Sequence, residues 1–404
     1  MNADKKAQAT RREALAQAQR KQRTQLKKAE VARAQLDKAT QKLSMLEAAI
    51  TLLIQADQAA KPARPDQKAA QAPDLRRALL IFNPKAKGAI DGTYEPAQIV
   101  ECLRRYGIAG ELAEKTSGKM ARKVAKAAVQ QGIGLVIVAG GDGTIEDVAG
   151  QLVGSETTLG IIPLGTMNNL ARSLGVPLNL DAACALLRTG ISRHIDVGRI
   201  ITADTPNGVY FLEMAGVGLS AHALNFGEGF MKGQWVKLLE ALGNAFVSTI
   251  DTVSIAYDDE APFQVQTHVV TIVNAPLFAG NMFIGPDAKM DDGVLDVALY
   301  GDMSKIDLEH HFRTIAAGKR VDDPRITFRR VRRIRVSSSV ALAANADLAV
   351  FPPQLIWDIS IVPGALSVIV GNGVGLTLPV ESARIVPPLT GPQPVLATAN
   401  GLVG

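Results

Sequence analysis

The strongest constraint on this chain is the run Gly140-Gly141-Asp142-Gly143-Thr144, which directly follows the apolar segment 135–139. An apolar, β-branched segment of this length predicts a buried parallel strand. Glycines at its carboxyl end allow the backbone to turn and to approach a ligand closely. Because parallel α/β sheets bind ligands at the carboxyl ends of their strands, this corner predicts a binding site. Exposed N–H groups there suit a phosphate, and the Asp142 carboxylate suits a metal cation.

The same alternation of strand, turn and helix recurs on both sides of this corner. Strands are predicted at residues 78–82 and 159–163, and helical segments at 95–106, 119–131, 145–152 and 170–174. This pattern is typical of an α/β fold with a parallel sheet. The loops 83–88, 140–144 and 165–168 would then offer N–H groups to a polyphosphate at one edge. Neither a P-loop signature nor a Gly-x-Gly-x-x-Gly signature occurs in the chain.

Near residue 196 the alternation of strand, turn and helix gives way to a series of predicted strands, which indicates a second, mostly β domain. Its strands are expected at 209–214, 253–257, 265–273, 294–300, 326–336 and 365–370, with one helical stretch at 234–248. The expected organisation is a helical extension 1–58, a linker 59–75, a nucleotide-binding α/β domain 76–196, a β domain 197–370 and a tail 371–404. We expect the tail to return in part to the α/β domain.

The N-terminal extension carries the positive charge of the chain. Residues 1–70 hold 15 Lys+Arg and 7 Asp+Glu, a balance of +8, whereas the remaining residues sum to −3. The sequence pI of about 9.1 therefore does not indicate a nucleic-acid-binding domain. Leu36, Leu43 and Ile50 recur every seven residues, which favours homo-oligomerisation through this helix. A basic helix would also suit an anionic membrane surface, and a solvated helix without a target is the alternative.

The composition points to a globular protein of a reducing compartment. Hydrophobic residues make up 47% and aromatic residues 4%, so aliphatic side chains must build the core. Two cysteines, Cys102 and Cys184, cannot form a disulfide framework. The first 30 residues lack the apolar core of a signal peptide, and the uncharged stretch 361–380 contains prolines and glycines that favour strands and turns. We expect a soluble, cytoplasmic protein.

Four motifs in order resemble the diacylglycerol kinase catalytic family, the bacterial lipid kinases that are related to sphingosine and ceramide kinases. They are Asn83-Pro84, the run 140–144, the segment 163–168 (Pro-Leu-Gly-Thr-Met-Asn) and the segment 286–296 (Pro-Asp-Ala-Lys-Met-Asp-Asp-Gly-Val-Leu-Asp). The resemblance covers roughly residues 76–370. It implies an ATP-binding α/β domain beside a β-sandwich domain, with the active site in the cleft between them.

The resemblance also implies a set of site residues. Those that would bind ATP are Asn83, Pro84, Lys85, Ala86, Lys87, Thr116, Gly140, Gly141, Asp142, Gly143, Thr144, Ile145, Glu146, Gly165, Thr166 and Asn168. Asp142 and Asp196 match acidic positions around a catalytic Mg²⁺. Lys289 and Val294 (through their carbonyl groups) and Asp292 match a second, structural Mg²⁺ site. Asp347 matches the general base, which would accept the proton of the lipid hydroxyl.

The chain departs from the family pattern at two positions. Asn169 stands where the family often has Asp, and it brings no charge for Mg²⁺. The segment Asp347-Leu348-Ala349 stands where the family has Asp-Gly-Glu, so one glycine and one carboxylate are missing. Either Asp347 works alone, or the alignment is shifted there, or the chain is impaired as a kinase.

We therefore predict a lipid kinase that uses ATP and Mg²⁺ and phosphorylates diacylglycerol or a similar lipid while docked transiently to the inner face of the membrane. The alternatives are a ceramide or sphingoid-base kinase, a pseudokinase that binds nucleotide or lipid without turnover, and an NAD kinase. A dense basic segment at 329–335 is open to two interpretations. It either recognises an anionic headgroup or forms a solvated edge strand that is protected by charge.

Overall fold

The computed structural model describes residues 77–202, 205, 207–218, 251–278 and 282–371. The predicted extension 1–58, the linker 59–75 and the helical stretch 234–248 lie outside these residues. Of the predicted tail, only Gly371 is described, and its N–H donates to the carbonyl group of Leu174 over 3.1 Å.

The first part of the described chain contains a parallel sheet. β1 (Ala78–Phe82) lies between β2 (Gly110–Glu114) and β3 (Leu135–Gly140), and β4 (Thr158–Pro163) pairs with the other side of β3. All residues of β3 and β4 are buried, which explains their continuous apolar sequences. The predicted parallel sheet is confirmed. β2 was not predicted, because this edge strand is mostly exposed and polar.

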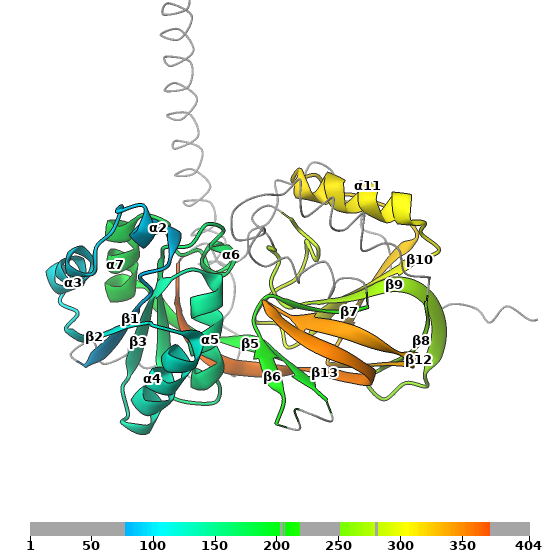
Figure 1. Ribbon diagram of the computed structural model, residues 1–404, viewed down its shortest axis with the longest axis horizontal. Helices are drawn as coiled ribbons and strands as arrows, with labels where there is room; N and C mark the ends of the chain where they lie inside the picture. The colour runs from blue at the N-terminus through cyan, green and yellow to red at the C-terminus, as the bar shows by residue number, and fades with distance from the viewer. Residues whose placement is uncertain (1–76, 203–204, 206, 219–250, 279–281, 372–404) are drawn as a thin grey trace, which may run out of the picture. The chain divides into compact units, whose positions relative to one another are not determined.

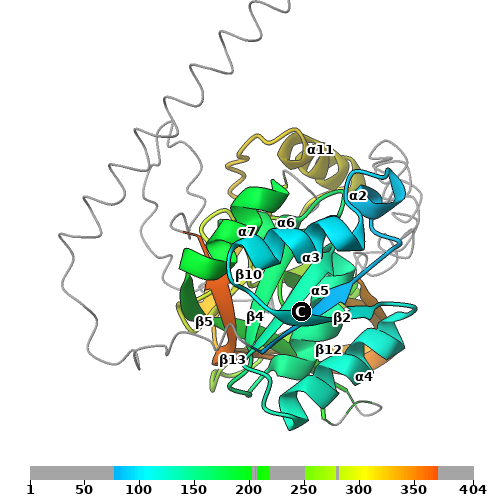
Figure 2. The same cartoon turned by 90° about the vertical axis from the view of Figure 1, so that its left-hand side faces the viewer.

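Helices cover both faces of this sheet (Figure 1, Figure 2). They are α2 (Lys87–Ile90), α3 (Pro96–Arg105), α4 (Gly118–Gln130), α5 (Asp142–Leu152), α6 (Asn169–Ser173) and α7 (Leu180–Thr189). Val136 and Val138 of β3 face the core beneath α4 and α5, whereas Leu135 and Ile137 face the core beneath α3 and α7. The alternation of side chains along the strand thus gives each helical layer its own apolar surface.

Two long strands join the α/β part to the β-rich part. β5 (Ile191–Ile201) and β13 (Ala349–Val370) pair antiparallel from Ile191 opposite Val370 to Ile201 opposite Asp358. Near its end β13 also pairs parallel with β4, through Val368 opposite Leu159. β13 therefore extends the α/β sheet, and the predicted domain boundary after Asp196 falls inside a strand that lies along both parts.

The second part of the described chain is rich in β-strands, as predicted. Its further strands are β6 (Val209–Phe211), β7 (Met214–Gly218), β8 (Asp251–Tyr257), β9 (Phe263–Val273), β10 (Leu295–Gly301), β11 (Ile326–Val331) and β12 (Arg333–Ala346). β9 and β12 each pair with β8 through one half and with β7 through the other. Their curvature encloses a core that includes Phe211 and Trp357, both less than 2% exposed.

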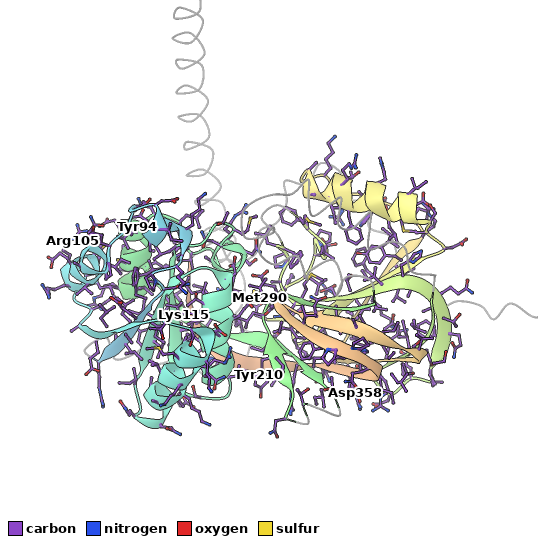
Figure 3. All side chains as sticks on the ribbon, in the orientation of Figure 1. Tyr94, Arg105, Lys115, Tyr210, Met290 and Asp358 are labelled. Atoms are coloured by element: carbon purple, nitrogen blue, oxygen red, sulfur yellow. The ribbon has the colours of Figure 1, made fainter. Side chains whose placement is uncertain are left out.

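The basic segment 329–335 forms two strands rather than the single strand 326–336 that we predicted. The Asp258 carboxylate accepts hydrogen bonds from the backbone N–H groups of Arg332 and Arg333 over 2.9 and 2.8 Å, and this breaks the run at Arg332. β11 lies at the sheet edge. Arg329 pairs with Glu260, while Arg333 and Arg335 pair with Asp358 on β13. Asp358 is labelled in Figure 3. Arg329 thus lies on a charged edge strand, whereas Arg333 and Arg335 lie on β12, which is paired on both sides.

Helix α11 (Lys305–Ala316) begins at a capping box in which Ser304 and Asp307 exchange hydrogen bonds. Within the described ranges, this helix and the others are all too short or too polar to traverse a lipid bilayer.

His311 of α11 makes the stability of this protein depend on pH. Its ring packs edge-on against Tyr300 and Phe312, and among the described residues its Nδ1 has no hydrogen-bond partner. Burial lowers the pKa of His311 to about 4, although the charge of Asp323 acts to raise it. The unfolded chain, with an ordinary imidazole pKa near 6.5, thus binds more protons between these values. Stability is lost as the pH falls through this window.

We expect His311→Leu to remove about 2 kcal/mol of the stability difference between pH 7.5 and pH 5, as the linkage relation gives for this pKa shift. Urea unfolding at the two pH values measures it. His310→Leu, at the exposed neighbouring position, is the matched control and should keep most of the pH dependence, because burial is the main cause of the His311 shift. Equal pH dependence in the His311 variant and the wild type would contradict the assignment.

Candidate functional site

Three loops meet at the carboxyl edge of the parallel sheet. The Asn83 N–H, directly after β1, donates to the carbonyl group of Ala139 in β3 over 2.9 Å. The Leu164 N–H, directly after β4, donates to the Gly140 carbonyl group over 2.8 Å, and the Gly88 N–H donates to the Leu164 carbonyl group over 2.9 Å. The glycine corners predicted from separate strands therefore lie side by side, which is the arrangement that a shared phosphate site requires.

Two of these loops touch through their glycines. A Cβ atom built on Gly165 would lie 2.6 Å from the Cα of Gly141, and one built on Gly141 would lie 3.0 Å from the Cα of Gly165. Asn168 holds the second loop closed: its Oδ1 accepts the Gly165 N–H over 2.8 Å, and its Nδ2 donates to the Gly165 carbonyl group over 3.0 Å. Asn168 adopts a left-handed conformation (φ 51°), which Asn tolerates better than most residues.

Side chains brace the corner beneath α5. Asn83 Nδ2 donates to the Thr144 hydroxyl over 2.8 Å, and Lys115 Nζ donates to the same hydroxyl over 3.2 Å. Lys115, labelled in Figure 3, also forms an ion pair with Asp147 of α5 over 2.9 Å, and both side chains are less than one-fifth exposed. This link positions the loop after β2 against the start of α5. The motifs did not identify Lys115 or Asp147, because neither belongs to a glycine turn.

Several predicted ATP-binding residues are exposed around these corners. Pro84, Lys85 and Lys87 follow β1, Thr116 follows β2, and Thr166 lies in the loop after β4. Ala86 and Ile145 are buried instead, and they belong to the apolar cores that support the loops. The structure thus brings the predicted ATP-binding residues to one edge, where the exposed ones surround the turns and the buried ones lie beneath them.

The Asp142 carboxylate lies at the start of two helices. Asp142 is the first residue of α5, and its Oδ1 accepts the N–H of Leu170 at the start of α6 over 3.2 Å. Burial raises the pKa of Asp142, while backbone N–H donors from Leu170 and Asn169 act to lower it. Backbone N–H groups at the starts of two helices therefore hold this carboxylate in place and favour its charged form.

Asp347 forms the turn between β12 and β13 and is only 4% exposed. Its Oδ2 accepts the Leu212 N–H over 2.6 Å, and its Oδ1 accepts those of Glu213 and Met214 over 2.8 and 3.0 Å. Burial raises the pKa of Asp347 to about 6, in spite of these three hydrogen bonds. The charge of Asp142 also raises it, so the two carboxylates lie close enough to interact.

The turn explains how the chain tolerates leucine in place of the family's glycine. The left-handed conformation falls on Asp347 (φ 48°) and not on Leu348, so residue 348 needs no glycine. The Leu348 side chain instead lies against the glycine corner: a Cβ atom on Gly143 would be 2.9 Å from Leu348 Cδ1. The Leu348 N–H donates to Glu146 Oε2 over 3.4 Å. This turn therefore contacts the start of α5.

Glu213 is a carboxylate of this site that no motif identified. It lies between β6 and β7 and is 4% exposed. Burial, followed by the charges of Asp142 and Asp347, raises the pKa of Glu213 well above its ordinary value. Burial and the same two charges do so for Glu146. A signal was present in the sequence, because Glu213 is the single acid within the otherwise apolar run 209–215.

Asp196, predicted together with Asp142 as a metal carboxylate, is held by two backbone N–H groups. Its Oδ2 accepts the Gly293 N–H over 2.6 Å, and its Oδ1 accepts the Gly364 N–H over 2.8 Å. Burial raises the pKa of Asp196, and the acids that add to this effect are Asp292 and Asp291. Met290, labelled in Figure 3, accepts the Asp196 N–H through its carbonyl group and belongs to the same apolar core as α4 and α5. Asp196 thus joins the segment that precedes β10.

The residues of the predicted second metal set lie in this segment. Lys289 is exposed, and Val294 directly precedes β10. Asp292 Oδ1 accepts the Val294 N–H over 3.4 Å, whereas its buried Oδ2 has no hydrogen bond among the described residues. The Arg330 guanidinium group lies 3.8 Å from that oxygen, within ion-pair range but beyond hydrogen-bond range. Across the described residues, no three His, Cys, Asp or Glu side chains converge in a geometry that would hold a metal by themselves.

Comparison with known proteins agrees with this architecture. The diacylglycerol kinase catalytic domain matches residues 77–200, and the YegS C-terminal NAD kinase beta sandwich-like domain matches residues 240–370. A diacylglycerol kinase of Bacillus subtilis is 30% identical over 285 residues, which cover 68% of this chain and 89% of the relative. One from Mycobacterium tuberculosis is 29% identical over 259 residues, covering 62% and 81%.

The fold has solved counterparts as well. A crystal structure of a diacylglycerol kinase from Bacillus anthracis superimposes with a TM-score of 0.57 at 22% identity, covering 74% of this chain and 99% of the other. That likeness establishes the fold. The sequence matches, which span both the α/β part and the β-rich part, establish that this chain belongs to the diacylglycerol kinase catalytic domain family, with a YegS-like C-terminal domain.

Proposed function

We propose that this protein is an ATP- and Mg²⁺-dependent lipid kinase that phosphorylates a hydroxyl group of diacylglycerol or a similar lipid. Membership of a kinase family supports the reaction class, and the names of the relatives support the acceptor. One observation carries the proposal: glycine corners from β1, β3 and β4 meet beside a buried acid, Asp347, whose pKa is about 6. A phosphate site next to a carboxylate of that pKa suits phosphoryl transfer to a hydroxyl group.

In this proposal the nucleotide phosphates bind at the loops 83–87, 140–146 and 165–168. The N-terminus of α5 lies in the second loop, and the first N–H groups of a helix have no partner within it. Together with the helix dipole they attract an anion. The contact between Gly141 and Gly165 keeps the two backbones close, so both can approach the same phosphates. Thr116 and Thr166 would add hydroxyl groups from the exposed rim.

The residues present fit a magnesium ion that is held mainly by the nucleotide. Asp142 offers a carboxylate, and the buried Oε1 of Glu213 has no hydrogen-bond partner among the described residues. Mg²⁺ is commonly bound by one or two carboxylates together with phosphates and water, so a cage of three protein ligands is not required. When bound, the ion would neutralise charge that develops on the transferred phosphoryl group.

Asp347 would act as the general base. Three backbone N–H groups fix its carboxylate in one orientation, while burial keeps its affinity for a proton above that of an ordinary Asp. It would accept the proton of the lipid hydroxyl as that oxygen forms its bond to the γ-phosphorus and ADP leaves. The second metal set, Asp292 and the carbonyl groups of Lys289 and Val294, would stabilise the segment before β10. Asp196 would be a further acidic position near the catalytic ion.

We also propose transient docking at the inner face of the cytoplasmic membrane. The basic extension 1–58 would supply the attraction, at about 1 kcal/mol for each Lys or Arg near an anionic surface. The same extension would mediate homo-oligomerisation through its heptad positions. Nucleic acid is not a partner in this proposal, because the excess positive charge lies in the first 70 residues.

Phosphorylation of a lipid panel tests the proposed function. The purified full chain is incubated with radiolabelled ATP and Mg²⁺ and, separately, with micelles of diacylglycerol, ceramide or sphingosine, or with NAD. We expect labelled phosphatidic acid from diacylglycerol. Label on ceramide or sphingosine would keep the reaction and change the acceptor, and formation of NADP would replace the proposal. ATP binding without any labelled product would identify a pseudokinase.

A further inference from the structure

The two departures from the family pattern both remove a carboxylate from this site. Asn169 stands where the family often has Asp, and Ala349 stands where the family has Glu. The fold places an acid from another segment, Glu213, beside Asn169. Asn169 Nδ2 donates a hydrogen bond to Glu213 Oε2 over 3.1 Å. A carboxylate therefore does lie near residue 169. It belongs to Glu213, between β6 and β7, and not to residue 169 itself.

The backbone around Glu213 is held on both sides. Its N–H donates to Asp347 Oδ1 over 2.8 Å, and its carbonyl group accepts the N–H groups of Asn274 and Ala275 over 2.9 Å each. With Asn169 bound to Oε2, the side chain has one defined direction. Its other oxygen, Oε1, is buried and has no hydrogen-bond partner among the described residues. Glu213 is therefore a positioned carboxylate with an open coordination position.

Glu213 is surrounded by other acids, an arrangement that a bound cation would stabilise. Asp142, Asp347 and Glu146 are close enough to interact electrostatically with it. None of the ion pairs between described residues joins a Lys or Arg side chain to any of these four acids. Glu213 and Asp347 are buried, whereas Asp142 and Glu146 are partly exposed. Buried carboxylates without a positive partner are costly, and an ion bound among them removes much of that cost.

We propose that Glu213, oriented by Asn169, is a ligand of the divalent cation that carries the nucleotide, together with Asp142. Glu213 would take the place of the carboxylate that is missing at residue 169. Asn169 donates the hydrogen bond and Glu213, as its acceptor, brings the carboxylate. This inference rests on the proposed function, because it requires a metal–nucleotide complex at this site. It adds a protein ligand that neither the motifs nor the matched family domains identify.

Manganese binding tests the assignment without relying on turnover. Electron paramagnetic resonance of free Mn²⁺ is measured with the full chain and a non-hydrolysable ATP analogue. We expect Glu213→Gln to weaken Mn²⁺ binding at least tenfold. Glu111→Gln, on the exposed strand β2, is the control and should bind like the wild type. Circular dichroism shows whether each variant is folded.

A charge-relocation variant separates the ligand role from a purely structural one. Asn169→Asp combined with Glu213→Gln keeps an amide opposite a carboxylate but moves the carboxylate to helix α6. We expect Mn²⁺ affinity within threefold of the wild type, and this result also decides the matter if Glu213→Gln alone does not fold. Weak Mn²⁺ binding by the folded double variant, or Mn²⁺ affinity equal to the wild type in Glu213→Gln, would overturn the role of Glu213 and leave the proposed function standing. Absence of Mn²⁺–nucleotide binding by the wild type would overturn the proposed function with it.

Discussion

Replacing Asp347 by Asn is expected to lower kcat by about 10²- to 10⁴-fold, the range typical of a lost general base. Asn retains the size of the side chain and tolerates the left-handed turn (φ 48°), but it cannot accept the proton of the lipid hydroxyl. Initial rates with radiolabelled ATP and the preferred lipid measure the effect. ATP affinity should change much less, because Asp347 lies beside the glycine corners and is not one of them.

The control for this substitution must reproduce its structural cost. The Asp347 carboxylate accepts three backbone hydrogen bonds, so Asn also weakens the turn between β12 and β13. Asp258 occupies a similar turn: its φ is 46°, and its carboxylate accepts the N–H groups of Arg332 and Arg333. Asp258→Asn should lower stability with little change in kcat. Full turnover by a folded Asp347→Asn protein would refute the role of Asp347 as the base.

Substituting Gly165 by Ala is expected to weaken nucleotide binding by tenfold or more. The added Cβ would lie 2.6 Å from Gly141 Cα, a backbone contact that no side-chain rotation can relieve, and 2.8 Å from Asn168 Oδ1. The two loops must separate, which costs about 1–3 kcal/mol of strain or displaces the N–H groups from the phosphates. Calorimetric titration with Mg²⁺ and an ATP analogue measures the loss of affinity.

Gly150→Ala is the matched control for the Gly165 variant. Gly150 lies inside α5, and a Cβ atom there would meet no atom within 4 Å. Alanine should stabilise the helix by about 0.5–1 kcal/mol and leave nucleotide affinity unchanged. If Gly165→Ala binds nucleotide as tightly as Gly150→Ala, the paired glycine corners do not form the phosphate site.

The parallel sheet and its glycine corners were predictable because local signals agree with the fold. The strand at residues 135–140 is apolar throughout because both of its faces are covered by helices. The glycines that follow occur where backbones approach within contact distance of another loop. Exposed or interrupted elements gave weaker signals. β2 was missed because it is polar, and the break at Arg332 was missed because its cause, Asp258, is distant in the sequence.

The amino-acid order alone indicates which loops carry the phosphate-binding motifs and that Asp142 is a candidate acid, since these features depend on neighbouring residues. Asp347 became a candidate only through the resemblance to the kinase family. Only the tertiary structure brings Glu213 against Asn169 and groups Asp196 with the segment before β10. These contacts join residues 44 and 97 positions apart. They depend on how β5, β7 and β13 cross between the α/β and β-rich parts, and strand pairing over such separations leaves no trace in local periodicity.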